Sequence, residues 1–439
     1  MATRFYSSVE YGRKFASTDP DVLYYNASII NNNTQDVGFD YDDPQVVFNE
    51  VRQFPLLQDT SDYMMSVVRF SFNGATKNLP LWIPRIQTGA TQMNPNLTIY
   101  GLKMSAVIDG TLFEISADKF LQWIPENDVS QPPQPPFLQQ NLTTNYYWGY
   151  TYSNFADMLN IAMREAVDDL VSQVQLVNPA YTRRTNYPFC YWDADTKRFS
   201  IRLDTRYWGG AMAQSPAPPA VGGERWNLWF NTNLESMLTN FKGLFIESSK
   251  PVYASGRNQI RVGTNSPTEP PNYPNQWPIY IETDLSTGYP YASPATGHTY
   301  WVVTQDYPSV TGSWSPVDAI CITSSLLPVI PEQQGQPTYL GGDSTGWSSQ
   351  TQQSAFQPIV ADISVNQEKG ADAVRGFVEF LPTAEYKMIA LSNSNQPLQN
   401  IDFQVWWRNR LDNNLYPLRL YNGTSVSIKV MFRRKQLGV

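Results

Sequence analysis

The sequence has 439 residues, enough for two or three domains with a substantial hydrophobic core. Its formal net charge of −8 argues against a protein whose whole surface binds nucleic acid. Only Cys190 and Cys321 are present, so no disulfide framework is implied, and free buried thiols are favoured over the one bridge that two cysteines allow.

The first segment, residues 1–45, is polar and irregular, and we expect an extended N-terminal arm because its apolar residues are too few to build a core. Its start lacks the apolar run of a signal peptide, and no stretch of the sequence is long and apolar enough to span a bilayer. Asp40, Asp42 and Asp43 could offer oxygen ligands to calcium. Their spacing does not fit the EF-hand loop, so a solvated acidic turn is favoured.

Residues 46–130 have the alternation of β-strands. Apolar and polar positions alternate from Met64 to Phe72, and an Asn73-Gly74 turn follows. Further strands are predicted at Leu79–Ile86, at Leu97–Ile108 and, after an Asp109-Gly110 turn, at Thr111–Trp123. Several strands joined by short turns indicate the first part of a sandwich or jelly roll.

A proline-rich run at residues 131–136 excludes both helix and central strand, and it opens an inserted, loop-rich domain predicted at residues 131–316. Tyr146–Tyr152 looks strand-like. A helix is predicted from Ser153 or Asn154 to Gln175, and a short one over residues 234–241. Strands are predicted in this domain at residues 189–192, 199–203, 279–283 and 300–304.

The second part of the jelly roll is predicted at residues 317–439, with strands at 317–324, 359–364 and 376–381. Two long strands then close the chain, and we expect them to form a hairpin. In each, apolar residues occupy every second position: Ile401, Phe403, Val405 and Trp407, then Val426, Ile428, Val430 and Phe432. The predicted fold class is therefore mainly β, a single jelly-roll sandwich with an inserted loop-rich domain that contains a few short helices.

Three stretches carry a family resemblance. The closing strands, FQVWWRNRLDNNLYPLRLYNG…VSIKVMFRRK, are preceded by ICITSSLLP at residues 320–328, and LPLWIPRI at residues 79–86 is followed by NLTIY at residues 96–100. Together these stretches resemble penton-type vertex capsid proteins of the polinton, virophage and adenovirus-like lineage of icosahedral DNA viruses. The match covers about two-fifths of the chain and leaves residues 132–316 unmatched.

The resemblance implies a structural capsid protein that forms a homopentamer, the penton, at the fivefold vertices of the virion. It implies contacts with the surrounding major capsid protein, and with minor capsid proteins or a vertex fibre. The alternative from another class is a carbohydrate- or receptor-binding β-sandwich, such as a spike or lectin-like module, in which Tyr146, Tyr147, Trp148, Tyr150 and Tyr152 could stack on sugars. Alternating aromatics are more typical of a core or an interface.

Catalytic signatures are scarce, so we predict that the protein is not an enzyme and has no cofactor. His298 is the only histidine, and it lies in a turn-like stretch with no nucleophile elbow. One histidine and two distant cysteines give no zinc-site spacing, and no phosphate-binding glycine loop occurs. A glycosidase pair remains as a third alternative. Its carboxylates could come from Glu332, Glu379 or Glu385, but nothing singles them out.

The C-terminal end has a charge of its own. From residue 401 to 439, seven basic residues face two acidic ones, a net charge of +5 that leaves −13 on the rest of the chain. Arg433, Arg434 and Lys435 form the predicted site, a genome-facing basic cluster in non-specific contact with packaged DNA. A solvated basic tail is the equal alternative.

Overall fold

The computed structural model divides into two compact units, each made of separate stretches of sequence. Unit 1 comprises residues 1–81, 142–145 and 315–439, and unit 2 comprises residues 82–141 and 146–314. The structure describes residues 19–31, 45–74, 79–87, 96–114, 118–126, 140, 142–143, 145–204, 224–239, 241, 243–247, 259–262, 279–283, 299–305, 307–308, 314, 316–330, 334–335, 357–365, 377–380, 387–392, 397–421 and 423–435.

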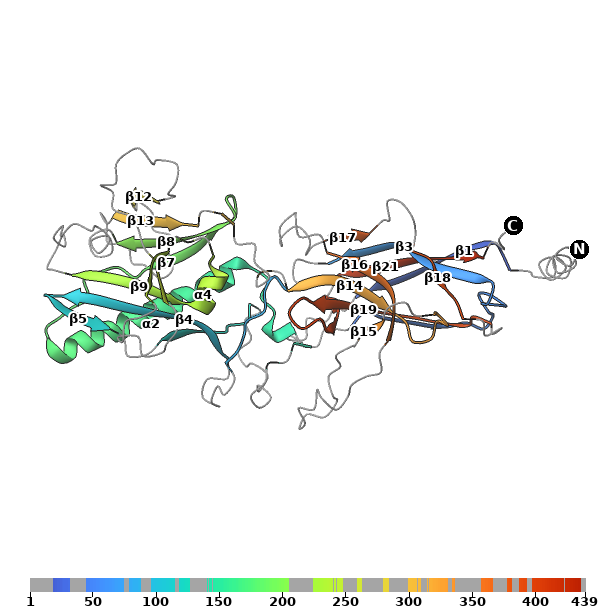
Figure 1. Ribbon diagram of the computed structural model, residues 1–439, viewed down its shortest axis with the longest axis horizontal. Helices are drawn as coiled ribbons and strands as arrows, with labels where there is room; N and C mark the ends of the chain where they lie inside the picture. Colours follow the sequence, from blue (N-terminus) through green and yellow to red (C-terminus); the bar gives the residue numbers. More distant parts are fainter. Residues whose placement is uncertain are drawn as a thin grey trace, which may run out of the picture. The chain divides into compact units, whose positions relative to one another are not determined.

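Unit 1 is a β-sandwich of two antiparallel sheets (Figure 1). The first sheet has the order β1-β21-β3-β17, with β18 also pairing with β3. Its strands are β1 (Val22–Ile30), β21 (Ser425–Arg434), β3 (Tyr63–Asn73), β17 (Phe377–Phe380) and β18 (Ile389–Ala390). The second sheet has the order β15-β16-β14-β19-β2, with β20 also pairing with β19. Its strands are β15 (Gln334–Gly335), β16 (Gln357–Ser364), β14 (Val317–Thr323), β19 (Asn400–Asn409), β2 (Val47–Val51) and β20 (Leu415–Pro417).

The two closing strands carry the buried residues that their alternation predicts, but they do not form a hairpin. All eight apolar positions named for them are at most 1% exposed. However, β19 belongs to the second sheet and β21 to the first. The reason is in the connection, where β20 turns back onto β19 before Gly423, at φ +78°, leads into β21. The alternation therefore identified the strands but not their partners.

The N-terminal arm predicted at residues 1–45 contains a strand of the sandwich. Residues 22–30 form β1, which pairs antiparallel with β21 from Val22 opposite Arg433 to Ile30 opposite Ser425. Its backbone is extended, as expected, but its core contacts come from a strand about 400 positions away in the chain. Asp40, Asp42 and Asp43 lie outside the described residues.

Unit 2 has two antiparallel sheets and two helices. One sheet has the order β10-β11-β9-β4-β5, with β6 also pairing with β4, and the other has the order β12-β13-β8-β7. The strands of the first are β4 (Leu97–Ile108), β5 (Thr111–Glu114), β6 (Lys119–Gln122), β9 (Arg225–Asn231), β10 (Gly243–Glu247) and β11 (Gln259–Val262). Those of the second are β7 (Phe189–Asp193), β8 (Arg198–Asp204), β12 (Ile279–Thr283) and β13 (Thr299–Thr304). The helices are α2 (Tyr152–Val177) and α4 (Thr232–Met237), and a 3-10 turn, η1, spans Asn145–Tyr147.

Helix α2 packs its apolar stripe, which includes Phe155, Leu159 and Ala166, against both sheets of unit 2. At 26 residues it is longer than the short helices expected for this domain. It begins at Tyr152, one or two residues earlier than predicted, because Thr151 accepts a hydrogen bond from the Asn154 amide and Glu126 accepts hydrogen bonds from the amides of Tyr150 and Thr151. The Asn160 side chain bonds both backbone groups of Cys190, which fixes the helix to the edge strand β7.

An aromatic core fills unit 2 beside α2. The Trp82 ring lies 5.2 Å from Trp123, 5.3 Å from Phe155 and 6.0 Å from Trp314. The five aromatics between Tyr146 and Tyr152 are all buried, at most 7% exposed, and the segment contains part of η1, an isolated bridge at Gly149 and the start of α2 rather than a strand. They therefore cannot stack on a sugar in solution, which removes the evidence that favoured a lectin-like site.

The boundary between the units differs from the expected one. Residues 82–130 were predicted to belong to the jelly roll, but residues 82–141 belong to unit 2. The predicted single strand at Thr111–Trp123 is two short strands, β5 and β6, that pair with different halves of β4. Residues 82–130 belong to unit 2 because β4 pairs on its other side with β9, which comes about 120 residues later in the chain. The proline-rich run at residues 131–136 lies outside the described residues.

A buried carboxylate in unit 1 holds the loop that follows β14. Asp402 on β19 is 3% exposed, and its two oxygens accept hydrogen bonds from the loop that follows β14. The donors are the Ser324 and Ser325 hydroxyls, at 2.5 and 2.7 Å, and the Ser325 and Leu326 amides, at 2.9 and 2.8 Å. Because every donor points at an oxygen, an amide nitrogen cannot replace either oxygen without facing another donor.

We predict that Asp402→Asn lowers the free energy of unfolding of unit 1 by about 2 to 4 kcal/mol, since buried donors lose a charged acceptor. Denaturant unfolding measures the loss. Asp62→Asn, which removes the same charge at an exposed position, is the control and should change stability by less than about 0.5 kcal/mol. Equal midpoints for the two variants would show that the loop is not held by Asp402.

A second prediction concerns the close approach between Gly149 and Trp82, whose backbones exchange two hydrogen bonds of 2.9 and 3.2 Å. A Cβ at position 149 would lie 2.1 Å from Trp82 Nε1. Gly149→Ala should therefore destabilise unit 2 by about 3 kcal/mol or more, because the indole is packed on all sides. Gly110→Asn is the contrast, since nothing lies within 4 Å of a Cβ there and asparagine tolerates the φ of +81°. Thermal unfolding that ranks Gly110→Asn below Gly149→Ala in stability would contradict the prediction.

Candidate assembly surface

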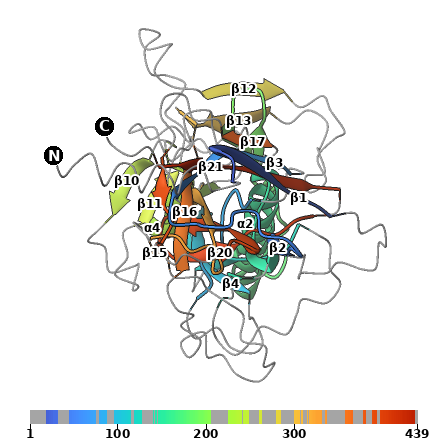
Figure 2. The same ribbon diagram turned by 90° about the vertical axis from the view of Figure 1, so that its right-hand side faces the viewer.

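The two sheets of unit 1 each end in an N-terminal strand on the same side of the sandwich. β1 is the edge of the first sheet and β2 the edge of the second, and Figure 2 shows the two strands on one side of the unit. Within the described residues, no strand pairs with the outer edge of either. We call this surface the β1–β2 side. Open strand edges of this kind are templates for pairing with another chain.

Side chains of β1 and β2 contact each other on the inner face of the β1–β2 side. The Tyr25 ring on β1 lies 6.1 Å from the Phe48 ring on β2, and the Tyr25 hydroxyl donates a hydrogen bond to Glu50. Burial and this bond to a carboxylate raise the pKa of Tyr25 well above its usual value, so the phenol stays protonated at any ordinary pH. The two sheets are therefore tied together at this side by a ring contact and a hydrogen bond.

Most of the exposed side chains on β1 and β2 are apolar. Exposed large hydrophobic residues on β1, on β2 and just after β2 are Val22, Tyr24, Ile30, Val47, Val51 and Phe54. Val51 is 75% exposed and Phe54 is 78% exposed. Elsewhere in the described part of unit 1, only Leu326, Ile330 and Leu411 are of this kind. A concentration of exposed apolar groups along two open edges is typical of a protein–protein interface.

The predicted basic cluster lies where β21 ends, and two of its three side chains bind groups of the same chain. The Arg434 guanidinium forms a 3.1 Å ion pair with Asp21 and donates to the Asp19 carbonyl and the Tyr63 hydroxyl, at 2.9 and 3.2 Å. The Lys435 ammonium donates to the Ser61 carbonyl at 2.7 Å. Their charges join the ends of β1, β3 and β21.

Arg433 is the exposed member of the cluster. It lies opposite Val22 on β1 and Met64 on β3. The hydrogen bonds of Arg434 and Lys435 within the chain could not be predicted from the sequence, because their partners lie about 370 to 415 positions earlier. The acidic residues Asp19 and Asp21 in the predicted arm, which contact Arg434, were the sequence feature that could have indicated internal ion pairing.

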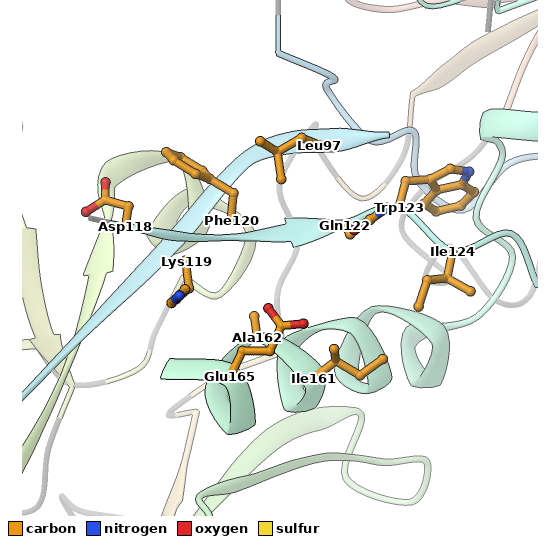
Figure 3. Close-up of a pocket in the computed structure, with 10 residues that line it drawn as sticks. All are labelled: Leu97, Asp118, Lys119, Phe120, Gln122, Trp123, Ile124, Ile161, Ala162 and Glu165. Atoms are coloured by element: carbon orange, nitrogen blue, oxygen red, sulfur yellow. The ribbon is translucent and has the colours of Figure 1, made fainter. Parts of the chain in front are cut away.

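Unit 2 contains a pocket of about 410 Å³ between β6 and α2. Figure 3 shows Lys119 pointing from the strand toward the helix and Glu165 pointing from the helix toward the strand. Lys119 is engaged in a 3.1 Å ion pair with Asp169, and Asp118 pairs with Lys103 at 3.4 Å. Since Lys119 and Asp118 are paired with charged groups of the same chain, Glu165 alone does not give the pocket the convergent polar groups of a ligand site.

The remaining candidates for chemistry do not come together. Glu379 is exposed on β17, while Glu332, Glu385 and His298 lie outside the described residues. Cys190 and Cys321 are free and buried, and burial raises the pKa of Cys321 to about 12, so it is not a reactive thiolate. In the ranges that the structure describes, no three His, Cys, Asp or Glu side chains could hold a metal ion. Nor does any helix there combine the length and apolarity needed to cross a membrane.

Comparison with known proteins gives concordant results. Residues 23–434 match the family model of the Sputnik minor capsid protein V18/19. The Uncharacterized protein V18 of Sputnik virophage is 33% identical over 160 residues, which cover 36% of this chain and 88% of that protein.

Two solved structures share the fold. A chain in the cryo-EM structure of the Sputnik virophage has a TM-score of 0.66 at 22% identity, with 95% of this chain and 99% of that chain covered. The mavirus penton protein has a TM-score of 0.53 at 13% identity, with 95% and 100% covered. At these identities the structures show a common fold over nearly the whole chain, which includes the middle that had no match by sequence motif. The match of the family model to residues 23–434 shows that the chain belongs to the Sputnik minor capsid protein V18/19 family, and it is a structural capsid component of a virophage-type virion.

Proposed function

We propose that the protein forms the homopentameric penton at the fivefold vertices of the capsid and contacts the surrounding major capsid proteins. The observation that carries the proposal is the β1–β2 side, where two open sheet edges carry six exposed apolar side chains on or just after their strands. A capsid component with such a surface is suited to contact another subunit. A contact between two different surfaces, repeated by a closing rotation, gives a ring.

The number five is supported by the fold shared with the mavirus penton protein over 95% of the chain. The vertex position, and contacts with minor capsid proteins or a fibre, belong to the same proposal. A capsid family favours a structural, non-enzymatic role. The carbohydrate-binding alternative has no exposed aromatic platform at Tyr146–Tyr152 to favour it.

We predict that native mass spectrometry of the purified protein at micromolar concentration gives a closed assembly of about 250 kDa, five times the chain mass of 49.9 kDa. Each subunit interface should bury at least roughly 1,000 Å². Sedimentation velocity over a concentration series is the independent check. A trimer, or a monomer at every concentration, would contradict the proposed penton.

We also propose, as a separate role, that the basic cluster faces the packaged genome. Its support is the net charge of +5 on residues 401–439 of an otherwise acidic chain. Arg434 and Lys435 are committed to internal contacts, so the exposed Arg433 is the residue of the cluster that would reach DNA phosphates.

This division of roles predicts opposite effects for neighbouring substitutions. Arg433→Gln should weaken low-salt binding of duplex DNA several-fold and change the free energy of unfolding by less than about 0.5 kcal/mol. Arg434→Gln should destabilise unit 1 by about 1 to 3 kcal/mol, because it removes hydrogen bonds from a charged donor. Fluorescence anisotropy and denaturant unfolding measure the two effects. DNA binding that is absent in the wild type, or unchanged by Arg433→Gln, would rule out the genome-facing role.

A further inference from the structure

The backbone of the β1–β2 side faces outward at the same residues whose side chains are exposed. Asp21 and Asn31, which flank β1, form backbone hydrogen bonds with Arg434 and Thr424 at the two ends of β21. The backbone N–H and C=O groups of the odd-numbered residues between them therefore point toward β21. The backbone N–H and C=O groups of the even-numbered residues therefore point to the open edge: Val22, Tyr24, Asn26, Ser28 and Ile30.

β2 has the same arrangement. Val46 accepts a hydrogen bond from Val405 and Arg52 donates one to Gln399, so the even-numbered positions of β2 face β19. The open edge is left to Val47, Asn49 and Val51, all of them exposed. Among the described residues, both edges thus offer peptide groups with no strand partner beside exposed side chains, several of them apolar, which is the combination that an added strand requires.

The opposite side of the sandwich also ends in strands. β17 is the far edge of the first sheet and β15 the far edge of the second. β1 and β3 both run antiparallel to β21, and β17 runs antiparallel to β3. Consequently β17 runs opposite to β1. If a second copy in the same orientation continues the sheet, its β17 meets β1 as an antiparallel partner.

The register follows from the pairing inside one copy. Phe377 pairs with Asn73, Asn73 with Ser425, and Ser425 with Ile30. By the same path Glu379 is level with Ser28 through Ser71 and Ser427. A rotation about an axis parallel to the strands keeps these levels, so β17 of the next copy would face the half of β1 that ends at Ile30.

We propose that the β1–β2 side of each subunit packs against the β17–β15 side of its neighbour, and that β17 adds to β1 as an antiparallel strand near Ser28 and Ile30. This inference rests on the proposed homopentamer and names the surfaces that close it. The occupant is a second copy of this chain, because the two sides are different edges of the same two sheets with matching strand direction. Such a contact is heterologous and closes into a ring. It also pairs the open edge of β1 with a strand.

The first test uses exposed positions, so that folding is preserved. The variant Ile30→Lys/Val51→Lys places two charges on side chains that are 58% and 75% exposed. Leu411→Lys is the matched control, since it makes the same kind of change at a 67% exposed position of unit 1 outside this side. Circular dichroism confirms that each variant is folded. In sedimentation velocity, we expect the wild type and Leu411→Lys to remain pentameric and the double variant to dissociate at least tenfold more readily.

The second test distinguishes strand pairing from side-chain contact. Hydrogen exchange at single-residue resolution should show the amides of positions 28 and 30 protected in the wild-type ring and unprotected in the dissociated double variant, in which position 30 is lysine. The Ala27 and Ile29 amides face β21 and should be protected in both. If Ser28 and Ile30 exchange equally in ring and monomer, strand addition is wrong.

The outcomes separate the two proposals. A wild type that is pentameric together with an equally pentameric double variant overturns the assigned surfaces and leaves the penton standing. A wild type that never forms a pentamer overturns the penton and, with it, the assignment of these surfaces.

Discussion

The fold of unit 1 depends on the central position of β21 between β1 and β3. This strand pairs over nine residues with β1 and over ten with β3, so it joins the beginning of the described chain to its end. Val426, Ile428, Val430 and Phe432 are at most 1% exposed, whereas Arg433 and Lys429 lie at more exposed positions of the same strand. Because pairing of such distant segments is slow and costly in chain entropy, the sandwich gains stability only when all three strands are assembled.

The charges at the end of β21 reinforce this assembly. Arg434 and Lys435 bind groups near the beginning of β1 and β3, and Tyr63 donates a 2.5 Å hydrogen bond to the Pro20 carbonyl. Burial is the main cause that raises the pKa of Tyr63, with the neighbouring Arg434 acting in the opposite direction. The result is a closure of three strand ends that leaves the edges of the sheets, rather than their ends, as the open part of the unit.

The contact between β1 and β2 within one subunit bears on how a second subunit can bind at the β1–β2 side. Tyr25 and Phe48 join the two sheets here, while the exposed side chains of β1 and β2 point away from this contact, so a neighbouring subunit could bind them without breaking it. The folded unit and the assembly surface are then separable, and substitutions at Ile30 or Val51 can act on one without the other. A capsid component benefits from this separation because the subunit must fold before it assembles.

The sequence by itself identified several of the strands and the buried face of each of these. Alternation found β3, β4, β19 and β21, and the spacing of Phe155 and Leu159 found α2, because these signals depend only on residues near one another in the chain. The turns at Asp109-Gly110 and Gly423 were also local, and both adopt positive φ.

The tertiary structure alone decided which strands pair. It placed β19 and β21 in different sheets, moved residues 82–130 into unit 2 and gave Arg434 its partner Asp21. Each of these depends on contacts between residues tens to hundreds of positions apart, for which the alternation of a strand carries no information beyond its buried face. The candidate surface is of the same kind, since β1 and β2 become neighbouring open edges only after β21 and β19 have taken their places.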